Sequence, residues 1–199
     1  DYLDGRGGTN IIDAGEGDDT IVVARAGDRI DGGPGNDIIQ TLDLSGYAGG
    51  SITLRPGSGQ SLALSDGTTI TSVERFGSVA LGNGDDIFDA GFFLGSADGG
   101  DGDDLIRLDY SGTGPNGETA TSVFFDLDGL SSFLNLGVGF ADTGASFRVG
   151  NFARVEITGS AGDDFLRGGN GNDILIGGAG DDYLDGRGGT NIIDAGEGD

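Results

Sequence analysis

Pairs of apolar residues recur at an interval of nine residues along much of the chain, and each pair follows a stretch rich in glycine and aspartate. Residues 159–194 divide into GSAGDDFLR, GGNGNDILI, GGAGDDYLD and GRGGTNIID. Each segment has glycine at its fourth position, Asp or Asn at its sixth and a bulky apolar residue at its eighth. Self-similarity at a short, fixed period is typical of repeat proteins, so we expect a stack of similar units.

The same register occurs in two further places. AGEGDDTIV, the degenerate VARAGDRID and GGPGNDIIQ fill residues 14–40, and LGNGDDIFD, AGFFLGSAD and GGDGDDLIR fill residues 81–107. A longer period is superimposed on the short one, because residues 182–199 repeat residues 1–18 letter for letter, 181 positions later. We expect tandem copies of this unit in the parent chain, with a deliberately engineered overlap as the alternative.

Two segments without nonapeptides, which we term the first spacer (41–80) and the second spacer (108–158), interrupt the repeats. One begins with TLDLSG and ends in SVERFGSVALGNGDDIF, and the other begins with RLDYSG and ends in ARVEITGSAGDDFL, which indicates an old duplication. Alternating polarity predicts strands, and Ser-Asp-Gly-Thr at 65–68 predicts a hairpin turn. The predicted strands are SITLR, SLALS, TTITSVERF, TSVFFDL and ASFRV. We expect no helix longer than a turn or two.

Composition adds a requirement to this picture. The chain has 44 glycines, no Cys, no His and a formal net charge of −24. So much glycine and uncompensated carboxylate would favour disorder, unless a multivalent cation neutralises and orders the chain. Nucleic acid and anionic membrane surfaces are excluded as partners because the ten basic residues are scattered. With no apolar run of about eighteen residues, we also expect no membrane insertion.

The nonapeptides resemble the repeats-in-toxin (RTX) family of calcium-binding sequences, G-G-x-G-x-D-x-U-x. This resemblance implies an all-β fold, a parallel β-roll stacked by several Ca²⁺ ions, in which each nonapeptide forms a tight turn and a short strand. Two nonapeptides would complete one eighteen-residue coil. The implied division is a calcium-binding roll at 1–40, a β-rich spacer at 41–80, roll at 81–107, a second β-rich spacer at 108–158, and roll at 159–199 continuing into a next copy.

Each position of the nonapeptide has a physical role in such a turn. Glycine at positions two and four permits positive φ angles and close backbone approach, and Asp at position six adds a hard anionic oxygen of the kind that Ca²⁺ prefers. Gly and Asp also mark ordinary turns, but the sustained register favours metal ligation. The candidate ligand turns contain Asp19, Asp28, Asp37, Asp86, Asp104, Asp164, Asp173, Asp182, Asn10 and Asn191, with Gly15, Gly17, Gly33, Gly35, Gly82, Gly84, Gly100, Gly102, Gly162, Gly169, Gly171, Gly178 and Gly180.

A coil of eighteen residues would place position-six residues eighteen apart on one edge, where they can share ions. The expected pairs are Asn10 with Asp28, Asp19 with Asp37, Asp86 with Asp104, Asp164 with Asp182, and Asp173 with Asn191. The ligand at Asn10 and Asn191 is neutral, and the turn before Asp28 is the degenerate RAG. We therefore expect a weaker or missing ion at those three turns.

The apolar positions predict an inside and an outside for each short strand. Position eight should form an internal ladder of Ile12, Ile21, Ile30, Ile39, Phe88, Ile106, Leu166, Leu175, Leu184 and Ile193. Position seven should face outward, with Ile11, Ile38, Ile87, Leu105, Phe165, Ile174, Tyr183 and Ile192. An outward apolar row indicates that another surface packs against it. We expect the spacers to supply most of it, and lateral association of chains is the alternative. The spacer aromatics Phe124, Phe125, Phe133, Phe140, Phe147 and Phe152 would then serve as core or cover.

Catalytic constellations are nearly absent. Without His and Cys, the serine and cysteine hydrolase triads and the H-E-x-x-H zinc motif are excluded. Paired carboxylates such as Asp18 and Asp19 recur along the chain, which is typical of turn ligands and not of a single active site. We expect that the chain is not an enzyme.

Three functional classes remain after these exclusions. The first is a calcium-stiffened structural repeat of a large adhesin, surface-layer or filament protein, secreted or on a bacterial cell surface, with copies of itself as neighbours in an array or fibre. The second is the calcium-triggered tail of a type I secreted enzyme or toxin. The third is an ice- or sugar-binding module, which would need a regular external row of Thr and Asn or a single aromatic-lined site; position five runs Thr9, Asp18, Gly27 and Asn36, so no ice-like row exists. The 181-residue period favours the first class, since solenoids extend by nearest-neighbour stacking.

Overall fold

The computed structural model describes residues 1–114, 119–127, 134–140 and 144–198, apart from the side chains of Ser58, 134–140 and 144–147. These residues form strands and no helix. The strands are β1 (Tyr2–Leu3), β2 (Ile11–Asp13), β3 (Thr20–Arg25), β4 (Arg29–Asp31), β5 (Ile38–Asp43), β6 (Thr53–Leu54), β7 (Gly57–Ala63), β8 (Thr69–Val73), β9 (Arg75–Ala80), β10 (Ile87–Gly91), β11 (Ser96–Asp98), β12 (Leu105–Asp109), β13 (Ala120–Asp126), β14 (Leu134–Phe140), β15 (Gly144–Gly150), β16 (Arg154–Thr158), β17 (Phe165–Arg167), β18 (Ile174–Ala179), β19 (Tyr183–Asp185) and β20 (Ile192–Glu197).

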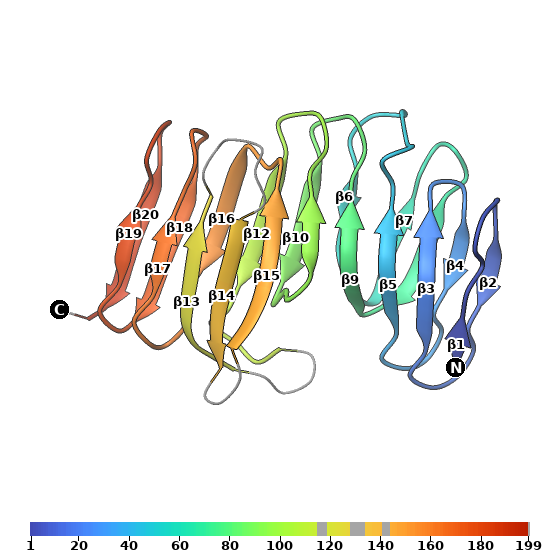
Figure 1. Cartoon of the computed structure of the whole chain (residues 1–199), viewed down its shortest axis with the longest axis horizontal. Helices are drawn as coiled ribbons and strands as arrows, with labels where there is room; N and C mark the ends of the chain where they lie inside the picture. The colour runs from blue at the N-terminus through green and yellow to red at the C-terminus, as the bar shows by residue number, and fades with distance from the viewer. Residues whose placement is uncertain (115–118, 128–133, 141–143, 199) are drawn as a thin grey trace.

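The strands lie in two faces of an elongated roll with the two ends of the described chain far apart (Figure 1). The front face is one ten-stranded sheet in the order β1-β3-β5-β9-β11-β15-β14-β13-β17-β19. The back face consists of a four-stranded sheet, β2-β4-β8-β7, and a six-stranded sheet, β20-β18-β16-β12-β10-β6. Successive nonapeptide strands therefore alternate between the two faces.

Strands on one face pair in parallel with a register of eighteen residues wherever nonapeptides are consecutive. Ile21 lies opposite Ile39 in the β3–β5 pair, and Leu166 lies opposite Leu184 in the β17–β19 pair. Two nonapeptides thus complete one coil. The predicted all-β, parallel β-roll is confirmed.

The core is the internal ladder of position-eight side chains. Eight of its ten predicted members are buried: Ile12, Ile21, Ile30, Ile39, Phe88, Ile106, Leu166 and Leu175. Leu184 is only half-buried, and the prediction is wrong for Ile193, which is 50% exposed. Both belong to the last described coil, which has a neighbouring coil on one side only, so their packing is incomplete.

The outward position-seven row is not covered in the way we expected. Spacer strands lie side by side with the nonapeptide strands within each face and lengthen that face, so they do not lie across the row. Side chains within the row partly cover one another instead. The rings of Phe124, Phe165 and Tyr183 stack at centroid distances of 4.7 and 4.8 Å, and the Arg167 guanidinium lies 4.7 Å from the Phe165 ring centroid.

Exposure along this row varies from end to end. Ile11, Tyr183 and Ile192 are exposed, and Ile38, Ile87, Phe165 and Ile174 are half-buried. Leu105 is buried, against the prediction. Its register neighbour is Arg154, whose Nε donates to the Asp103 carboxylate at 3.1 Å.

Both spacers leave and rejoin the roll in the same way. From a nonapeptide strand, the chain crosses to the opposite face and then returns as a strand parallel to the one that it left. The first spacer returns as β9 beside β5, and the second returns as β16 beside β12. Each departure contains the same small turn, in which the Asp43 or Asp109 carboxylate accepts hydrogen bonds from Ser45 or Ser111, respectively.

The spacers differ in the face that they extend. The first spacer adds β6 and the β7–β8 hairpin to the back, and the turn predicted at 65–68 connects β7 to β8. The second adds β13, β14 and β15 to the front, with β14 antiparallel to both neighbours. Phe125 and Phe152 are core residues, whereas Phe124 is 48% exposed. Phe133 and the side chains of Phe140 and Phe147 lie outside the described residues.

In the part of the chain that the structure describes, no helix is long and apolar enough to cross a membrane.

Candidate metal centre

The position-six residues form ladders along the edges of the roll. In every predicted pair, one side-chain oxygen of the later residue accepts a hydrogen bond from the backbone N–H of the residue eighteen positions earlier. The N···O distances lie between 2.7 and 2.9 Å for Asn10–Asp28, Asp19–Asp37, Asp86–Asp104, Asp164–Asp182 and Asp173–Asn191. All five pairs are therefore brought together as expected.

The second carboxylate oxygen, Oδ2, divides the aspartates into two groups. In the first group, Oδ2 accepts a hydrogen bond from a backbone N–H of its own turn. The donors are Arg25 N for Asp28 (2.8 Å), Gly82 N for Asp86 (3.1 Å), Ser160 N for Asp164 (2.6 Å) and Gly169 N for Asp173 (2.8 Å). We term these four the closed turns, because the protein itself satisfies both carboxylate oxygens.

In the second group, Oδ2 is buried and has no hydrogen-bond partner. This group comprises Asp19, Asp37, Asp104 and Asp182, and we term their turns the open turns. A buried polar atom without a partner costs roughly 1–3 kcal/mol, and more when it carries charge. A bound cation would remove that cost.

Backbone conformation separates the turns in the same way. Positive φ occurs at the position-two and position-four glycines of three open turns, namely Gly15 with Gly17, Gly100 with Gly102, and Gly178 with Gly180, and at Gly33 in the fourth. The prediction of positive φ is wrong for Gly35, Gly82, Gly84, Gly162, Gly169 and Gly171, which are absent from the positive-φ residues. In the closed turns the backbone instead folds back so that an N–H reaches the carboxylate.

Close stacking is what requires glycine at most of these other positions. A Cβ on Gly35 would lie 1.9 Å from the carbonyl oxygen of Gly17, and one on Gly162 would lie 1.9 Å from that of Thr121. Gly169 is an exception, since its nearest neighbour would be 3.4 Å away.

Stacking also places main-chain carbonyl groups beside the open carboxylates. A Cβ on Gly33 would lie 2.1 Å from the Gly15 carbonyl oxygen, and one on Gly177 would lie 2.6 Å from the Ala195 carbonyl oxygen and 2.2 Å from Asp182 Oδ2. Each turn thus points carbonyl oxygens at the next turn. Among the described residues, no group of three or more His, Cys, Asp or Glu side chains converges. A metal would therefore need carbonyl ligands as well as carboxylates, and that hard-oxygen set suits Ca²⁺.

Burial makes the negative charge of these aspartates unfavourable while no cation is bound. Desolvation raises the pKa of Asp104 from 3.8 to about 6. Desolvation also raises the pKa of Asp37, Asp86 and Asp164, although backbone N–H groups that donate to these carboxylates oppose the shift. A divalent cation would favour the ionised form, so the residues present fit calcium.

In the turns that carry Asn at position six, the amide group makes its hydrogen bonds to protein oxygens. The Asn191 amide nitrogen Nδ2 donates to the carbonyl oxygens of Gly186 (2.8 Å) and Gly188 (2.9 Å). The Asn10 amide donates to Asp28 Oδ1 at 3.2 Å. These amides occupy oxygens that a metal would need, which supports the expectation of a weaker or missing ion at Asn10, Asp28 and Asn191.

One side chain in the ladder was missed by the sequence pattern. Glu74, in the first spacer, accepts the backbone N–H of Asp37 through Oε2 at 2.8 Å, as a position-six aspartate does elsewhere. It lies in SVERF, outside any nonapeptide. The sequence pattern placed it inside the predicted strand TTITSVERF, whereas the structure breaks that segment between β8 and β9 at Glu74.

A comparison with known protein families finds matches to the nonapeptide segments. The RTX calcium-binding nonapeptide repeat family matches four times, over residues 1–21, 27–42, 156–184 and 167–199. Residues 81–107 lie outside these matches, yet Asp86 and Asp104 stack there in the same way. A comparison with curated proteins found no significant match. The turns, the ladders and the family matches agree, and the matched segments of this chain are RTX calcium-binding nonapeptide repeats.

Proposed function

We propose that this chain is an extracellular structural repeat that folds and stiffens on binding several calcium ions. It would be part of a long tandem-repeat adhesin, surface-layer or filament protein, secreted or on a bacterial cell surface, and it would not be an enzyme. The observation that carries the proposal is the set of open turns, in which buried carboxylate oxygens of Asp19, Asp37, Asp104 and Asp182 have no partner.

The mechanism is coupling of metal binding to folding. Each ion that binds only the folded coil stabilises it by RT ln(1 + [Ca²⁺]/Kd). For a Kd of roughly 10⁻⁴ M, typical of the tighter extracellular calcium modules, millimolar calcium contributes about 1.4 kcal/mol per ion. Several ions together would decide whether a chain with a net charge of −24 folds. Low cytosolic calcium would then leave the chain unfolded for export.

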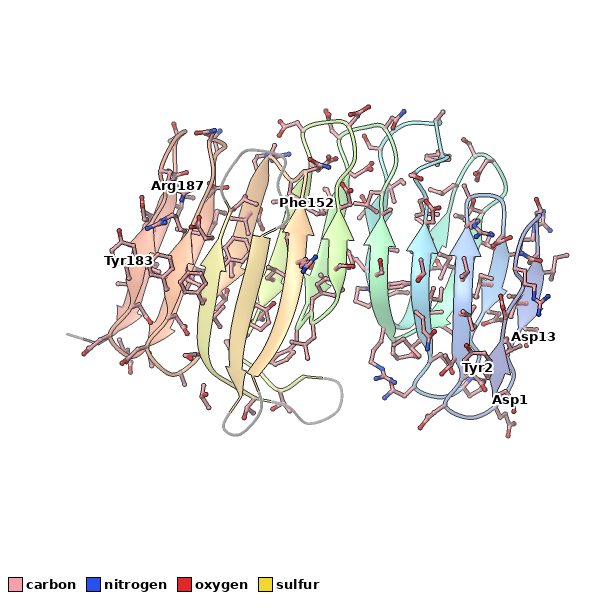
Figure 2. All side chains as sticks on the ribbon, viewed as in Figure 1. Asp1, Tyr2, Asp13, Phe152, Tyr183 and Arg187 are labelled. Carbon is pink, nitrogen blue, oxygen red and sulfur yellow. The ribbon has the colours of Figure 1, made fainter. Side chains whose placement is uncertain are left out.

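The repeated eighteen-residue segment supports an array. At the N-terminal end, β1 and β2 stack on the coil that follows them, and at the C-terminal end, β19 and β20 stack on the coil that precedes them. The labelled Tyr2 and Tyr183, equivalent residues of this segment, lie at opposite ends of the roll (Figure 2). Backbone angles also agree, with φ of 57° at Arg6 and 52° at Arg187.

One coil sequence therefore accepts a neighbour on either side, and consecutive copies can join into an unbroken roll. The step from β1 to β19 on the front face covers nine strand spacings. At about 4.8 Å per spacing, each 181-residue copy would lengthen the roll by roughly 43 Å. An array serves length, which suits a stalk or fibre better than the secretion tail of an enzyme.

Circular dichroism of residues 1–199 tests calcium-driven folding. We expect β signal in millimolar CaCl₂, loss of that signal in excess chelator, and recovery when calcium is restored. Matched MgCl₂ is the control, since Mg²⁺ demands a tighter octahedral site. A β signal that survives thorough chelation unchanged would rule out the coupling. The sequence that flanks this segment tests the array: further 181-residue copies support it, and an adjoining hydrolase domain contradicts it.

A further inference from the structure

Two acids that are hydrogen-bonded to each other, where the first spacer rejoins the roll, each have a buried carboxylate oxygen without a partner. Asp37 is fully buried, with 0% exposure, and its Oδ2 has no hydrogen-bond partner. Glu74 Oε2 accepts the Asp37 backbone N–H at 2.8 Å, while Glu74 Oε1 is buried and without a partner. Each acid therefore presents one free oxygen in a buried setting, which is unfavourable unless a cation lies between them.

Glu74 occupies the next rung of the calcium-type ladder. Asp37 stacks on Asp19, and Glu74 stacks on Asp37 through the same kind of backbone hydrogen bond. The backbone N–H groups of Glu74 and Arg75 both donate to the Asp37 carbonyl oxygen, at 3.1 and 3.0 Å. The returning spacer is thus fixed directly against the last nonapeptide turn.

A main-chain carbonyl group approaches the same place. Ser72 has a φ of 54°, an uncommon value for a residue other than glycine. A Cβ on Gly32 would lie 2.1 Å from the Ser72 carbonyl oxygen and 2.7 Å from Asp37 Oδ2. The turn therefore brings a carbonyl oxygen close to the free carboxylate oxygen, as the nonapeptide turns do.

The second spacer provides an internal comparison, because it returns with the same backbone. Asn151 has a φ of 56°, and its carbonyl oxygen would lie 2.3 Å from a Cβ on Gly99, with Asp104 Oδ2 at 2.8 Å. Ala153 N and Arg154 N both donate to the Asp104 carbonyl oxygen at 3.0 Å. The residue equivalent to Glu74 is therefore Ala153, so the second return lacks the extra carboxylate.

We propose that Glu74 is a calcium ligand, which together with Asp37 forms a metal site outside the nonapeptide motif and extends the ion ladder into the first spacer. This inference rests on the proposed calcium binding of the open turns. The ion would fasten the spacer to the roll. Calcium would then stabilise the junction between the repeats and the inserted strands as well as the repeats themselves.

Glu74→Gln tests the proposal, because glutamine keeps an oxygen that can accept the Asp37 N–H but removes the charge. The matched control is Glu156→Gln. Glu156 also follows a valine in the returning segment, but it lies within β16 and pairs with Arg107. Calcium stoichiometry is measured by titration calorimetry and equilibrium dialysis. We expect Glu74→Gln to bind one ion fewer than wild type, or to bind one ion at least tenfold more weakly, and Glu156→Gln to match wild type.

The reverse substitution, Ala153→Glu, gives a second readout should Glu74→Gln fold poorly. It should add one ion or tighten binding at Asp104 at least tenfold. If both Glu74→Gln and Ala153→Glu bind as many ions as wild type with unchanged affinity, the role of Glu74 is overturned while calcium binding by the repeats stands. If wild type binds no calcium, the proposed function itself fails, and the two failures are thereby distinguished.

Discussion

Open and closed turns share one sequence motif but differ in what they stack upon. In the open turns at Asp37, Asp104 and Asp182, the carboxylate accepts a hydrogen bond from the backbone N–H of another position-six aspartate in a nonapeptide turn. Three closed turns receive an N–H from a spacer residue instead: Ile52 for Asp86, Val123 for Asp164 and Val155 for Asp173. The fourth, at Asp28, has the degenerate RAG sequence.

This difference teaches that the unit of a candidate metal site is a pair of stacked turns. In a turn that follows a spacer, a backbone N–H of the same turn satisfies the aspartate Oδ2. In the turn stacked on it, the aspartate Oδ2 has no hydrogen-bond partner. We therefore expect fewer complete sites than there are copies of the motif. The predictions below test this distinction.

The largest effect is expected from adding a side chain to a glycine of an open turn. Gly178→Ala places a Cβ at a φ of 117° and 2.2 Å from the Ser160 carbonyl oxygen. We expect a loss of stability of about 2 kcal/mol or more in calcium, measured by urea unfolding. Gly169→Ala in a closed turn is the control, because its Cβ would meet nothing closer than 3.4 Å. Equal losses in the two variants would refute the difference between the turns.

A smaller effect is expected from neutralising the aspartates themselves. Asp182→Asn removes a carboxylate whose Oδ2 is free, so it should lower the number of bound ions by one. Asp173→Asn removes a carboxylate that two backbone N–H groups already satisfy. It should leave the stoichiometry unchanged and cost roughly 1 kcal/mol of stability. Dialysis against calcium distinguishes them, and a lost ion in Asp173→Asn would contradict our assignment of that turn as closed.

The smallest effect is expected from pH in the absence of calcium. The pKa of Asp104 is raised to about 6 in the folded state, against 3.8 for the unperturbed group. A raised pKa contributes stability that is fully present below the unfolded value and is lost as the pH rises through about 6. In chelator, the folded fraction seen by circular dichroism should therefore increase between pH 7 and pH 4. Calcium affinity should fall over the same interval, because protons and calcium compete. Asp104→Asn should flatten both dependences.

Much of this structure could be predicted from local sequence, because each coil contacts only its neighbours. The eighteen-residue register, the buried ladder and the stacked pairs all follow from the repeat. Glu74 and Glu156 show the limit. Both follow a valine in the returning segment and look equivalent in sequence, yet Glu74 lies against Asp37 and Glu156 pairs with Arg107 in mid-strand. The two spacers return with the same backbone, but the Val-Glu pair lies before the strand in the first return and within the strand in the second, and only the hydrogen-bond register shows this.

The outward apolar row was also misjudged for a physical reason. Apolar side chains in parallel, in-register strands cover one another, as the stacked rings of Phe124, Phe165 and Tyr183 do. In mid-roll this mutual contact leaves Ile38, Ile87 and Ile174 half-buried without strands lying across them. The sequence pattern predicts which way a side chain points, but its final exposure also depends on the neighbouring coil.

The placement of the two spacers on opposite faces has a mechanical consequence. Where β5 pairs with β9 on the front face, the first spacer inserts extra strands into the back face. Where β12 pairs with β16 on the back face, the second spacer inserts β13, β14 and β15 into the front face. Either insertion alone would give one face more strands than the other, and the roll would bend toward the shorter face. Together they leave both faces equal in strand number, so the curvature from one insertion is cancelled by the next. A fibre built from such copies would run straight on average while undulating within each copy.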